Sequence, residues 1–293
     1  MPAPQQEAAI RFGCFIGTLL VMGVWELLAP QRPLTQSKPL RWSSNLGLAL
    51  LNNVAWRLLM PAGAVGIALA VQTRGWGLFN HVALPDWFEI AASVVLLDLA
   101  IYAQHWVFHR VPWLWRLHLV HHVDLDFDAT TGIRFHIVET LLSFAWKAVI
   151  FALLGPATLA VMIFEILLNA TALFNHGNVR LPPSLDRVLR WVLVTPDMHR
   201  VHHSVEDRET NSNYGFCLPW WDFLFRTYRS QPAAGHAGLV IGRPEYRTAD
   251  TARLWFLLCL PFRRELPPPP CGRMGASTST AETQSSISSD SSR

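Results

Sequence analysis

Long apolar segments constrain the fold of this chain more than any other feature of its sequence. Crossing the hydrocarbon core of a bilayer as a helix takes roughly 20 apolar residues. Four runs approach or exceed that length, at residues 12–29, 46–71, 87–104 and 141–174. Charged residues make up only 15% of the chain, whereas soluble domains are about a quarter charged. We therefore expect an all-α integral membrane bundle.

Two of these runs contain signals that interrupt a helix. The second includes Asn52, Arg57 and Pro61, which predict a kink or a break. The fourth has Gly155-Pro156 near its middle, a turn signal, and is expected to form two spans joined as a hairpin. The bundle then has about four to five membrane-embedded segments. The first run lacks a clear cleavage site and is longer than a typical signal-peptide core, which predicts a retained span.

The positive-inside rule predicts the orientation of the bundle. Basic residues follow the first run and the third run, whereas the loop 72–86 between these two segments carries only Arg74. Two crossings separate the basic segments, so we expect both on the cytoplasmic side of the membrane. Their basic residues are Arg32, Lys38, Arg41, Arg110, Arg116 and Arg134.

Eight of the 12 histidines lie in three short boxes, which read HWVFH at 105–109, HLVHH at 118–122 and HRVHH at 199–203. Residues three and four apart share one face of a helix, and neutral imidazole is the commonest metal ligand in proteins. Because a hairpin separates the last box from the others, all three are expected in a helical cap on one membrane face. The candidate ligands are His105, His109, His118, His121, His122, His199, His202 and His203.

The number of imidazoles indicates more than one metal ion. A zinc site takes three or four protein ligands, so eight or nine histidines would serve two metals with four or five ligands each. Imidazole suits Zn, Cu, Fe and Ni alike. The spacing alone therefore does not identify the metal.

The three boxes resemble the H-x3-H, H-x2-HH and H-x2-HH boxes of the fatty acid hydroxylase/sterol desaturase superfamily of membrane di-iron enzymes, and the chain looks most like its bacterial sterol-desaturase-type proteins. Surrounding segments support the resemblance over roughly residues 90–230. They are RFHIVE at 134–139, FNHGNVRLP at 174–182, TPDMHRVHH at 195–203, NYG at 213–215 and WDFLFRTY at 221–228. The chain departs from the family at Ile137, where proline is usual, and at Arg226, where glycine is frequent.

The resemblance implies an enzyme that holds two Fe ions and uses O2 to hydroxylate or desaturate a C–H bond of a lipid, whether a sterol, a fatty acyl or an alkyl chain. Fold and metal site do not decide between these two outcomes. A separate electron donor of the cytochrome b5, ferredoxin or reductase type is expected, because no such domain is recognisable in the sequence. The expected location is a bacterial inner membrane, with the active site on the cytoplasmic side. The net charge of +3 is small and scattered, which argues against a nucleic-acid partner.

Membrane metal transporters and haem-type electron carriers also place histidines on helices, and they are the alternative functions. Transporters hold their ligands near the bilayer midplane, whereas the boxes here lie at or beyond the ends of the runs, beside Arg110, Arg116 and Arg200. Two haems would use four axial ligands and leave four box histidines without a role.

His176, in the segment FNHGN, is a candidate for a ninth ligand. It lies just past the returning arm of the hairpin, on the face expected to carry the boxes. Related proteins also have histidine beside asparagine in this segment. As a ligand, its ring should point toward His122 and His202. The alternative is a capping histidine that donates a hydrogen bond to a backbone carbonyl at the end of the span.

Asp98 and His136 are further candidates. Asp98 precedes His105 and His109 on one helical stripe and lies within a span, where an ionisable residue is usually functional. It is expected either to accept a hydrogen bond from a ligand imidazole or to pair with Arg57. His136 is either an additional ligand or gate, or an ordinary loop histidine near the site.

The composition divides the chain into four parts. Residues 1–86 would hold the N-terminal spans, 87–230 the catalytic domain, 231–265 a C-terminal extension, and 266–293 a disordered Pro/Ser/Thr tail that cannot bury a core. Thr195-Pro196 predicts the start of the helix that bears the third box. The cysteines show no metal-binding or disulfide spacing and are expected to be unpaired thiols: Cys14, Cys217, Cys259 and Cys271.

Overall fold

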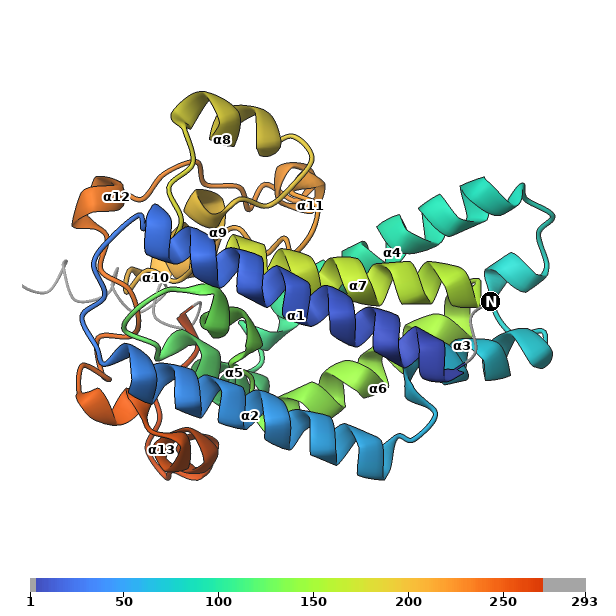
Figure 1. The fold of residues 1–293 in the computed structure, drawn as a ribbon, viewed down its shortest axis with the longest axis horizontal. Coiled ribbons are helices and arrows are strands. Elements are labelled where there is room, and N and C mark those ends of the chain that lie inside the picture. The colour runs from blue at the N-terminus through green and yellow to red at the C-terminus, as the bar shows by residue number, and fades with distance from the viewer. Residues whose placement is uncertain (1–3, 271–293) are drawn as a thin grey trace, which may run out of the picture.

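The computed structural model describes residues 4–270 and confirms an all-helical membrane bundle (Figure 1). Within these residues there is no β-strand, only two isolated bridges. Five helical segments are long and apolar enough to cross a membrane: Gln6–Leu28, Lys38–Thr73, Asp86–Phe108, Ile137–Leu154 and Thr158–Asn175. The longest helices are α1 (Pro4–Leu28), α2 (Lys38–Leu59), α4 (Asp86–Phe108), α6 (Ile137–Leu154) and α7 (Thr158–Asn175).

The second apolar run is broken, as expected from its proline. Helix α2 ends at Leu59, and α3 (Gly63–Thr73) begins after a short turn. Pro61 lies in this turn, where its missing N–H group and its fixed φ do not allow α2 to continue. Gly63 opens α3 with φ of 61°, a left-handed conformation that glycine adopts without steric cost. Helix α3 then packs against both α6 and α7.

The fourth run forms the predicted hairpin. Helix α6 ends at Leu154 and is capped by Gly155, which has φ of 65°. Pro156 then prevents the helix from continuing before α7 starts at Thr158. A Cβ atom at Gly155 would lie 2.5 Å from the carbonyl oxygen of Trp76, so only glycine fits this turn. The two arms return the chain to the end of the bundle from which α6 begins (Figure 1).

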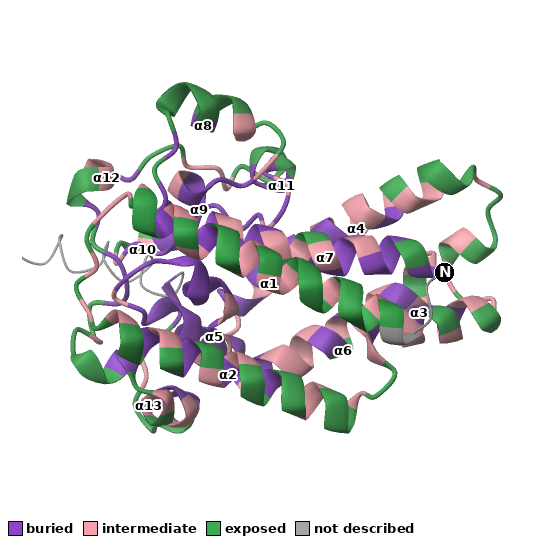
Figure 2. Cartoon of the chain, viewed as in Figure 1, coloured by how far each residue is buried: buried purple, intermediate pink, exposed green. Residues whose placement is uncertain are grey.

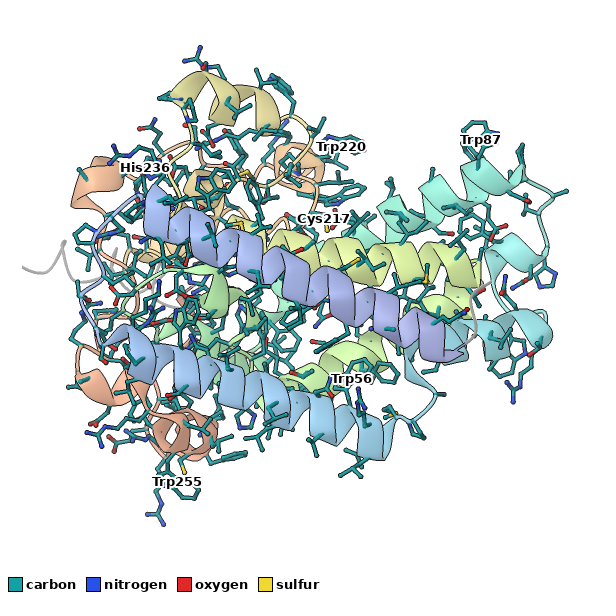
Figure 3. The ribbon with its side chains drawn as sticks, viewed as in Figure 1. Trp56, Trp87, Cys217, Trp220, His236 and Trp255 are labelled. Carbon is teal, nitrogen blue, oxygen red and sulfur yellow. The ribbon has the colours of Figure 1, made fainter. Side chains whose placement is uncertain are left out.

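Apart from η1 (Leu78–Asn80), which connects α3 to α4 at the far end, the remaining short elements gather at one end of the bundle and form a cap (Figure 1). Figure 2 shows that buried residues concentrate around α5 in this cap, whereas the long helices are largely exposed along their outer faces. Exposed tryptophans flank the bundle, Trp87 at the far end and Trp220 and Trp255 on the cap side (Figure 3), the placement that tryptophan favours at membrane–water interfaces. The cap elements are α5 (Pro112–His122), η2 (Ala129–Ile133), α8 (Pro183–Leu189), α9 (Pro196–His202), α10 (Asp207–Thr210), α11 (Trp220–Leu224), α12 (Gly235–Gly238), η3 (Ala249–Ala252), α13 (Leu254–Cys259) and η4 (Leu260–Phe262).

A buried ionic network fixes α5 relative to α2. Arg41 donates from Nε and Nη2 to the carboxylate of Asp124 at 2.9 and 2.8 Å, and from Nη1 to Asp128 at 2.6 Å. Arg134 donates to the carbonyl of Val120 at 2.8 Å, near the end of α5. Such charges are stable in the interior only when they are paired and hydrogen-bonded. The network therefore sets the position of the helix that carries the second histidine box.

The predicted C-terminal tail starts too early. Leu266 packs against the apolar cluster that includes Leu257 and Leu260, and Pro269 and Pro270 are buried. The prediction is therefore wrong for residues 266–270, because an apolar side chain within the proline-rich segment found a packing partner. The rest of the predicted tail, together with Cys271, lies outside the described residues. Cys14, Cys217 and Cys259 are free thiols, as expected.

Candidate metal centre

Nine buried histidines come together in the cap as two adjacent groups. Within each group, one ring nitrogen from every histidine lies within 4.8 Å of the others. The five-histidine group consists of His105, His109, His118, His122 and His202. The four-histidine group consists of His121, His176, His199 and His203. The structure thus brings together all eight box histidines and His176.

Helix geometry explains how the second and third boxes each serve both groups, whereas both histidines of the first box belong to the five-histidine group. In α5, His118 and His122 are one helical turn apart and face the five-histidine group, whereas His121 faces the four-histidine group. The third box reverses this assignment. His199 and His203 join the four-histidine group, and His202 joins the other. Thr195 caps α9 by accepting a hydrogen bond from the Met198 N–H, as predicted, and so fixes where this box begins.

Carbonyl and carboxylate oxygens hold the rings of the five-histidine group. His105 Nδ1 lies 2.8 Å from the Tyr214 carbonyl, and His202 Nδ1 lies 2.7 Å from the Ser212 carbonyl. A carbonyl can only accept, so both imidazoles donate from Nδ1 and carry their lone pair on Nε2. The Nε2 atoms of His105, His202 and His118 are buried without a hydrogen-bond partner. Buried nitrogen lone pairs without partners are rare, and here they suit a metal ion.

The four-histidine group shows the spacing that a shared metal ion requires. His176 donates from Nδ1 to the Ala172 carbonyl at 2.8 Å. Its Nε2 lies 3.1 Å from His121 Nε2 and 3.2 Å from His199 Nε2. With metal–nitrogen bonds of about 2.1 Å, two ligand atoms are about 3.0 Å apart at a right angle and about 3.4 Å apart at the tetrahedral angle. The observed separations fall between these limits, so the residues fit a metal.

The position of His176 differs from the prediction in one respect. Its ring faces His121 and His199, not His122 and His202. The expected capping bond to a carbonyl is also formed, through Nδ1. The two interpretations are therefore compatible, since the capping bond uses one ring nitrogen and leaves the other directed into the group.

Burial keeps the imidazoles neutral. It lowers the pKa of His118 and of His176 to about 3, and it lowers the pKa of His199 and His202 well below the usual value. Neutral imidazole is the form that binds metal ions.

Aromatic rings enclose the site. Phe127 stacks on His176 with ring centroids 5.3 Å apart, Phe135 stacks on His121 at 4.7 Å, and Trp115 lies beside His109.

Glu139 is a site residue that the sequence analysis did not identify. It lies in the first turn of α6, is buried, and places Oε1 2.6 Å from Nδ1 of His118. A carboxylate behind a histidine fixes the orientation of the ring and makes it a better ligand. The motif RFHIVE contained the signal, since Glu139 is an acidic residue at the start of an apolar run.

Asp98 and His136 lie outside both groups. Asp98 accepts hydrogen bonds from the backbone N–H groups of Cys217 and Leu218 at 3.1 Å and from Trp221 Nε1 at 2.8 Å. The expected bond to a ligand imidazole and the alternative pairing with Arg57 are both wrong. The Asp98 carboxylate is instead hydrogen-bonded to the segment 217–221, which is distant in sequence.

His136 has the role of an ordinary loop histidine. Its Nδ1 accepts a hydrogen bond from the N–H of Val138 and caps α6. Its Nε2 lies 3.3 Å from the carbonyl of Leu258. With both ring nitrogens used in this way, His136 positions the start of α6 and thereby Glu139.

Comparisons with known proteins agree with this site. The family model described as fatty acid hydroxylase matches residues 90–227, which include all nine histidines. The chain is 30% identical to ornithine lipid hydroxylase OlsE of Rhizobium tropici, over 74% of this chain and 66% of the relative. It is 29% identical to an alkylglycerol monooxygenase of Xenopus tropicalis, over 66% of this chain and 42% of the relative.

A cholesterol 25-hydroxylase-like protein of Danio rerio is also 29% identical, over 67% of this chain and 76% of the relative. The chain spans less than two thirds of the length of the first two relatives. No solved structure matches the chain significantly. The matched region, the three boxes and the two histidine groups coincide, and together they support the assignment of the chain to the fatty acid hydroxylase superfamily.

Proposed function

We propose that this protein is a membrane oxygenase that uses O2 to hydroxylate a C–H bond of a lipid. The observation that carries the proposal is the convergence of nine buried histidines, several with Nδ1 fixed by a hydrogen bond and Nε2 directed into the group. The relatives support hydroxylation over desaturation, because each is named as a hydroxylase or monooxygenase.

Two iron ions are the proposed cofactors. The five-histidine group would hold one and the four-histidine group the other. Iron would supply the reduction of O2 and the oxidation of an unactivated C–H bond, for which amino-acid side chains have no chemistry. Superfamily membership supports this choice of metal, since imidazole alone does not distinguish iron from zinc.

The residues around the groups would prepare the site for this chemistry. The carbonyls of Tyr214 and Ser212 hold the protons on Nδ1 of His105 and His202, so that these rings cannot rotate away. Glu139 orients His118 in the same way. Phe127 and Phe135 cover the four-histidine group and exclude water, which limits unproductive side reactions.

The location of the groups favours an oxygenase over the alternatives. His105 lies in the last turn of α4 and His176 directly follows α7, so the groups lie at the ends of spans and not near their middle. A lipid chain could enter from the bilayer at this level, whereas a transporter site is expected at the midplane. We also propose that the cap lies on the cytoplasmic side of a bacterial inner membrane and receives electrons from a separate donor.

A comparison of lipids made with and without this protein tests the proposal. Expression in a host membrane should produce lipids heavier by one oxygen atom, in amounts that depend on O2. His199→Ala should abolish the product, because it removes a nitrogen from the four-histidine group. His81→Ala is the matched control, since His81 is exposed and lies outside both groups. A product lighter by two hydrogens would show desaturation, and unchanged lipids with fully metal-loaded protein would refute the oxygenase.

A further inference from the structure

A cavity of about 880 Å³ lies where α1 and α7 leave the membrane-spanning part of the bundle. Its walls come from the segments that follow these helices, together with residues of α9 and α12. His236 of α12 marks its position near the cap end of α1 (Figure 3). The candidate span Gln6–Leu28 ends one residue before Ala29, which lines the cavity. The cavity is therefore at the depth of the lipid headgroups.

The lining of the cavity is positively charged. Arg32, Arg180 and Arg200 line it, and Asp197 is the acidic residue among them. Arg200 is 1% exposed, pairs with Asp197, and donates to the Gly177 carbonyl at 3.2 Å. Its Nε, like Nη1 of Arg32, is buried without a hydrogen-bond partner. Buried donors without partners are costly, and guanidinium groups match the oxygen atoms of phosphate and carboxylate. The cavity is suited to an anionic oxygen group.

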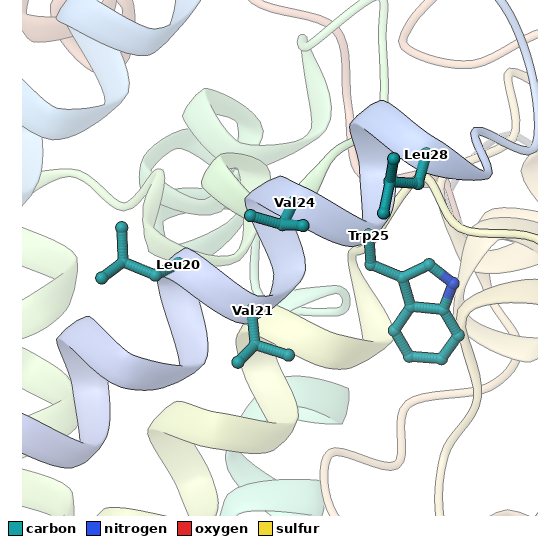
Figure 4. A pocket seen from close by; sticks show the side chains of 5 residues that line it. All are labelled: Leu20, Val21, Val24, Trp25 and Leu28. Atoms are coloured by element: carbon teal, nitrogen blue, oxygen red, sulfur yellow. The ribbon is translucent and has the colours of Figure 1, made fainter.

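A shallow apolar groove lies on the outer face of α1, whose last lining residue, Leu28, directly precedes Ala29 of the cavity. It has a volume of about 450 Å³ and is lined by Leu20, Val21, Val24, Trp25 and Leu28 (Figure 4). These residues cover about 12 Å of helix at 1.5 Å per residue. Trp25 lies close to the end of the span, where tryptophan is favoured at the interface. The groove and the cavity thus follow one another along the chain, apolar first and cationic second.

We propose that the cavity binds the phosphate or carboxylate headgroup of an anionic membrane lipid whose hydrocarbon chain lies in the groove along α1. This site is separate from the metal centre, because none of the nine histidines lines the cavity. Arg200 forms the wall between them, and its guanidinium lies 5.3 Å from the ring of Phe127, which stacks on His176. The proposal is therefore independent of the proposed activity.

A bound lipid would join two segments that already pair through their backbones. The N–H of Arg180 donates to the Ala29 carbonyl at 3.0 Å, and the N–H of Gln31 donates to the Asn178 carbonyl at 3.0 Å. An anion held between Arg32 and Arg180 would neutralise two like charges on these segments. Because the lipid binds only the folded arrangement, its binding should raise the thermal stability of the protein.

Lipid binding to the purified, metal-loaded protein tests this site. The protein in neutral detergent is titrated with phosphatidylglycerol, with phosphatidylcholine of equal chain length, and with inorganic phosphate. Bound lipid is measured by native mass spectrometry and stability by the melting temperature. We expect phosphatidylglycerol to bind at least tenfold more tightly than phosphatidylcholine and to raise the melting temperature. The double variant Arg32→Ala/Arg180→Ala should lose at least tenfold in phosphatidylglycerol affinity.

The control is Arg187→Ala/Arg208→Ala, which removes the same charge from exposed positions outside the cavity and should bind phosphatidylglycerol like the wild type. Equal losses in both double variants would overturn the proposal in favour of diffuse charge attraction. A stability gain from inorganic phosphate equal to that from the lipid would also overturn it, since a free anion would then suffice. If the cavity double variant does not fold, Arg180→Glu at its exposed position replaces it, and wild-type lipid affinity there refutes the site.

Discussion

Glu139 Oε1 lies 2.6 Å from His118 Nδ1, and both groups are buried in the interior of the cap. The contact joins the first turn of α6 to the middle of α5, two helices separated by the loop that contains the buried ionic network. His118 is a member of the five-histidine group, so the contact places a carboxylate directly behind one of its rings. The carboxylate is thus well placed to control one ligand of one metal.

Removal of this carboxylate should weaken metal retention. Glu139→Ala leaves Nδ1 of His118 without an acceptor, and loss of such a partner typically costs 10–100-fold in metal affinity or activity. Glu139→Gln keeps an acceptor oxygen and should lose less. Metal content after dialysis against a graded chelator measures the effect. Glu206→Ala, at an exposed position, is the control. Wild-type retention in Glu139→Ala would show that the contact only fills space.

His176→Ala should remove one metal of two. It takes away the nitrogen that lies 3.1–3.2 Å from both His121 and His199, while the five-histidine group keeps all its members. Elemental analysis should fall from about two metal ions per chain to about one, with membrane insertion unchanged. Retention of two ions would exclude His176 from the ligand set.

Asp98→Asn should destabilise the protein without a selective loss of metal. The carboxylate accepts three hydrogen bonds, from two backbone N–H groups and from Trp221. An amide has only one acceptor oxygen, and each bond to a charged group contributes about 1.5–3 kcal/mol. We expect a lower melting temperature and near-normal metal content in the protein that remains folded. Normal stability together with a loss of bound metal would contradict this prediction and show that Asp98 acts at the metal site.

Arg226→Gly should stabilise the protein. Arg226 has φ of 58° and is exposed, and a left-handed conformation costs an L-residue roughly 1–2 kcal/mol. Glycine avoids this cost but loses about 0.5–1 kcal/mol in chain entropy. The net gain should be about 1 kcal/mol or less, visible as a small rise in melting temperature. Arg226→Ala is the control and should not raise it, because alanine keeps the strained φ.

Two truncations should separate the packed from the unpacked part of the C-terminus. Ending the chain after Arg264 removes Leu266 from its contact with the cluster around Leu257 and exposes apolar surface, so stability should fall. Ending it after Pro270 keeps this contact and should leave the melting temperature unchanged. Identical melting curves for both truncations would mean that Leu266 contributes nothing.

Much of the fold and most of the site follow from local sequence patterns. The apolar runs set the spans, Gly155-Pro156 sets the hairpin, and Thr195 sets the start of α9, because each depends on nearby residues alone. The placement of His176 beside His121 depends on how the end of α7 lies relative to α5, which no local pattern specifies. The partners of Asp98 lie 119 to 123 residues away. The role of Glu139 was missed for the same reason, since its partner is 21 residues distant on another helix.

The adjacent histidine pairs at the ends of α5 and α9 have a mechanical consequence. One member of each pair belongs to each group, and the ring centroids are 5.2 Å apart for His121 and His122 and 5.5 Å apart for His202 and His203. Neighbouring Cα atoms are fixed at 3.8 Å by the peptide bond. The separation between the two groups is therefore built twice into the covalent chain. The two pairs have nearly equal spacing, so they hold the distance between the two groups at one value. A hinge motion between domains could not change this distance.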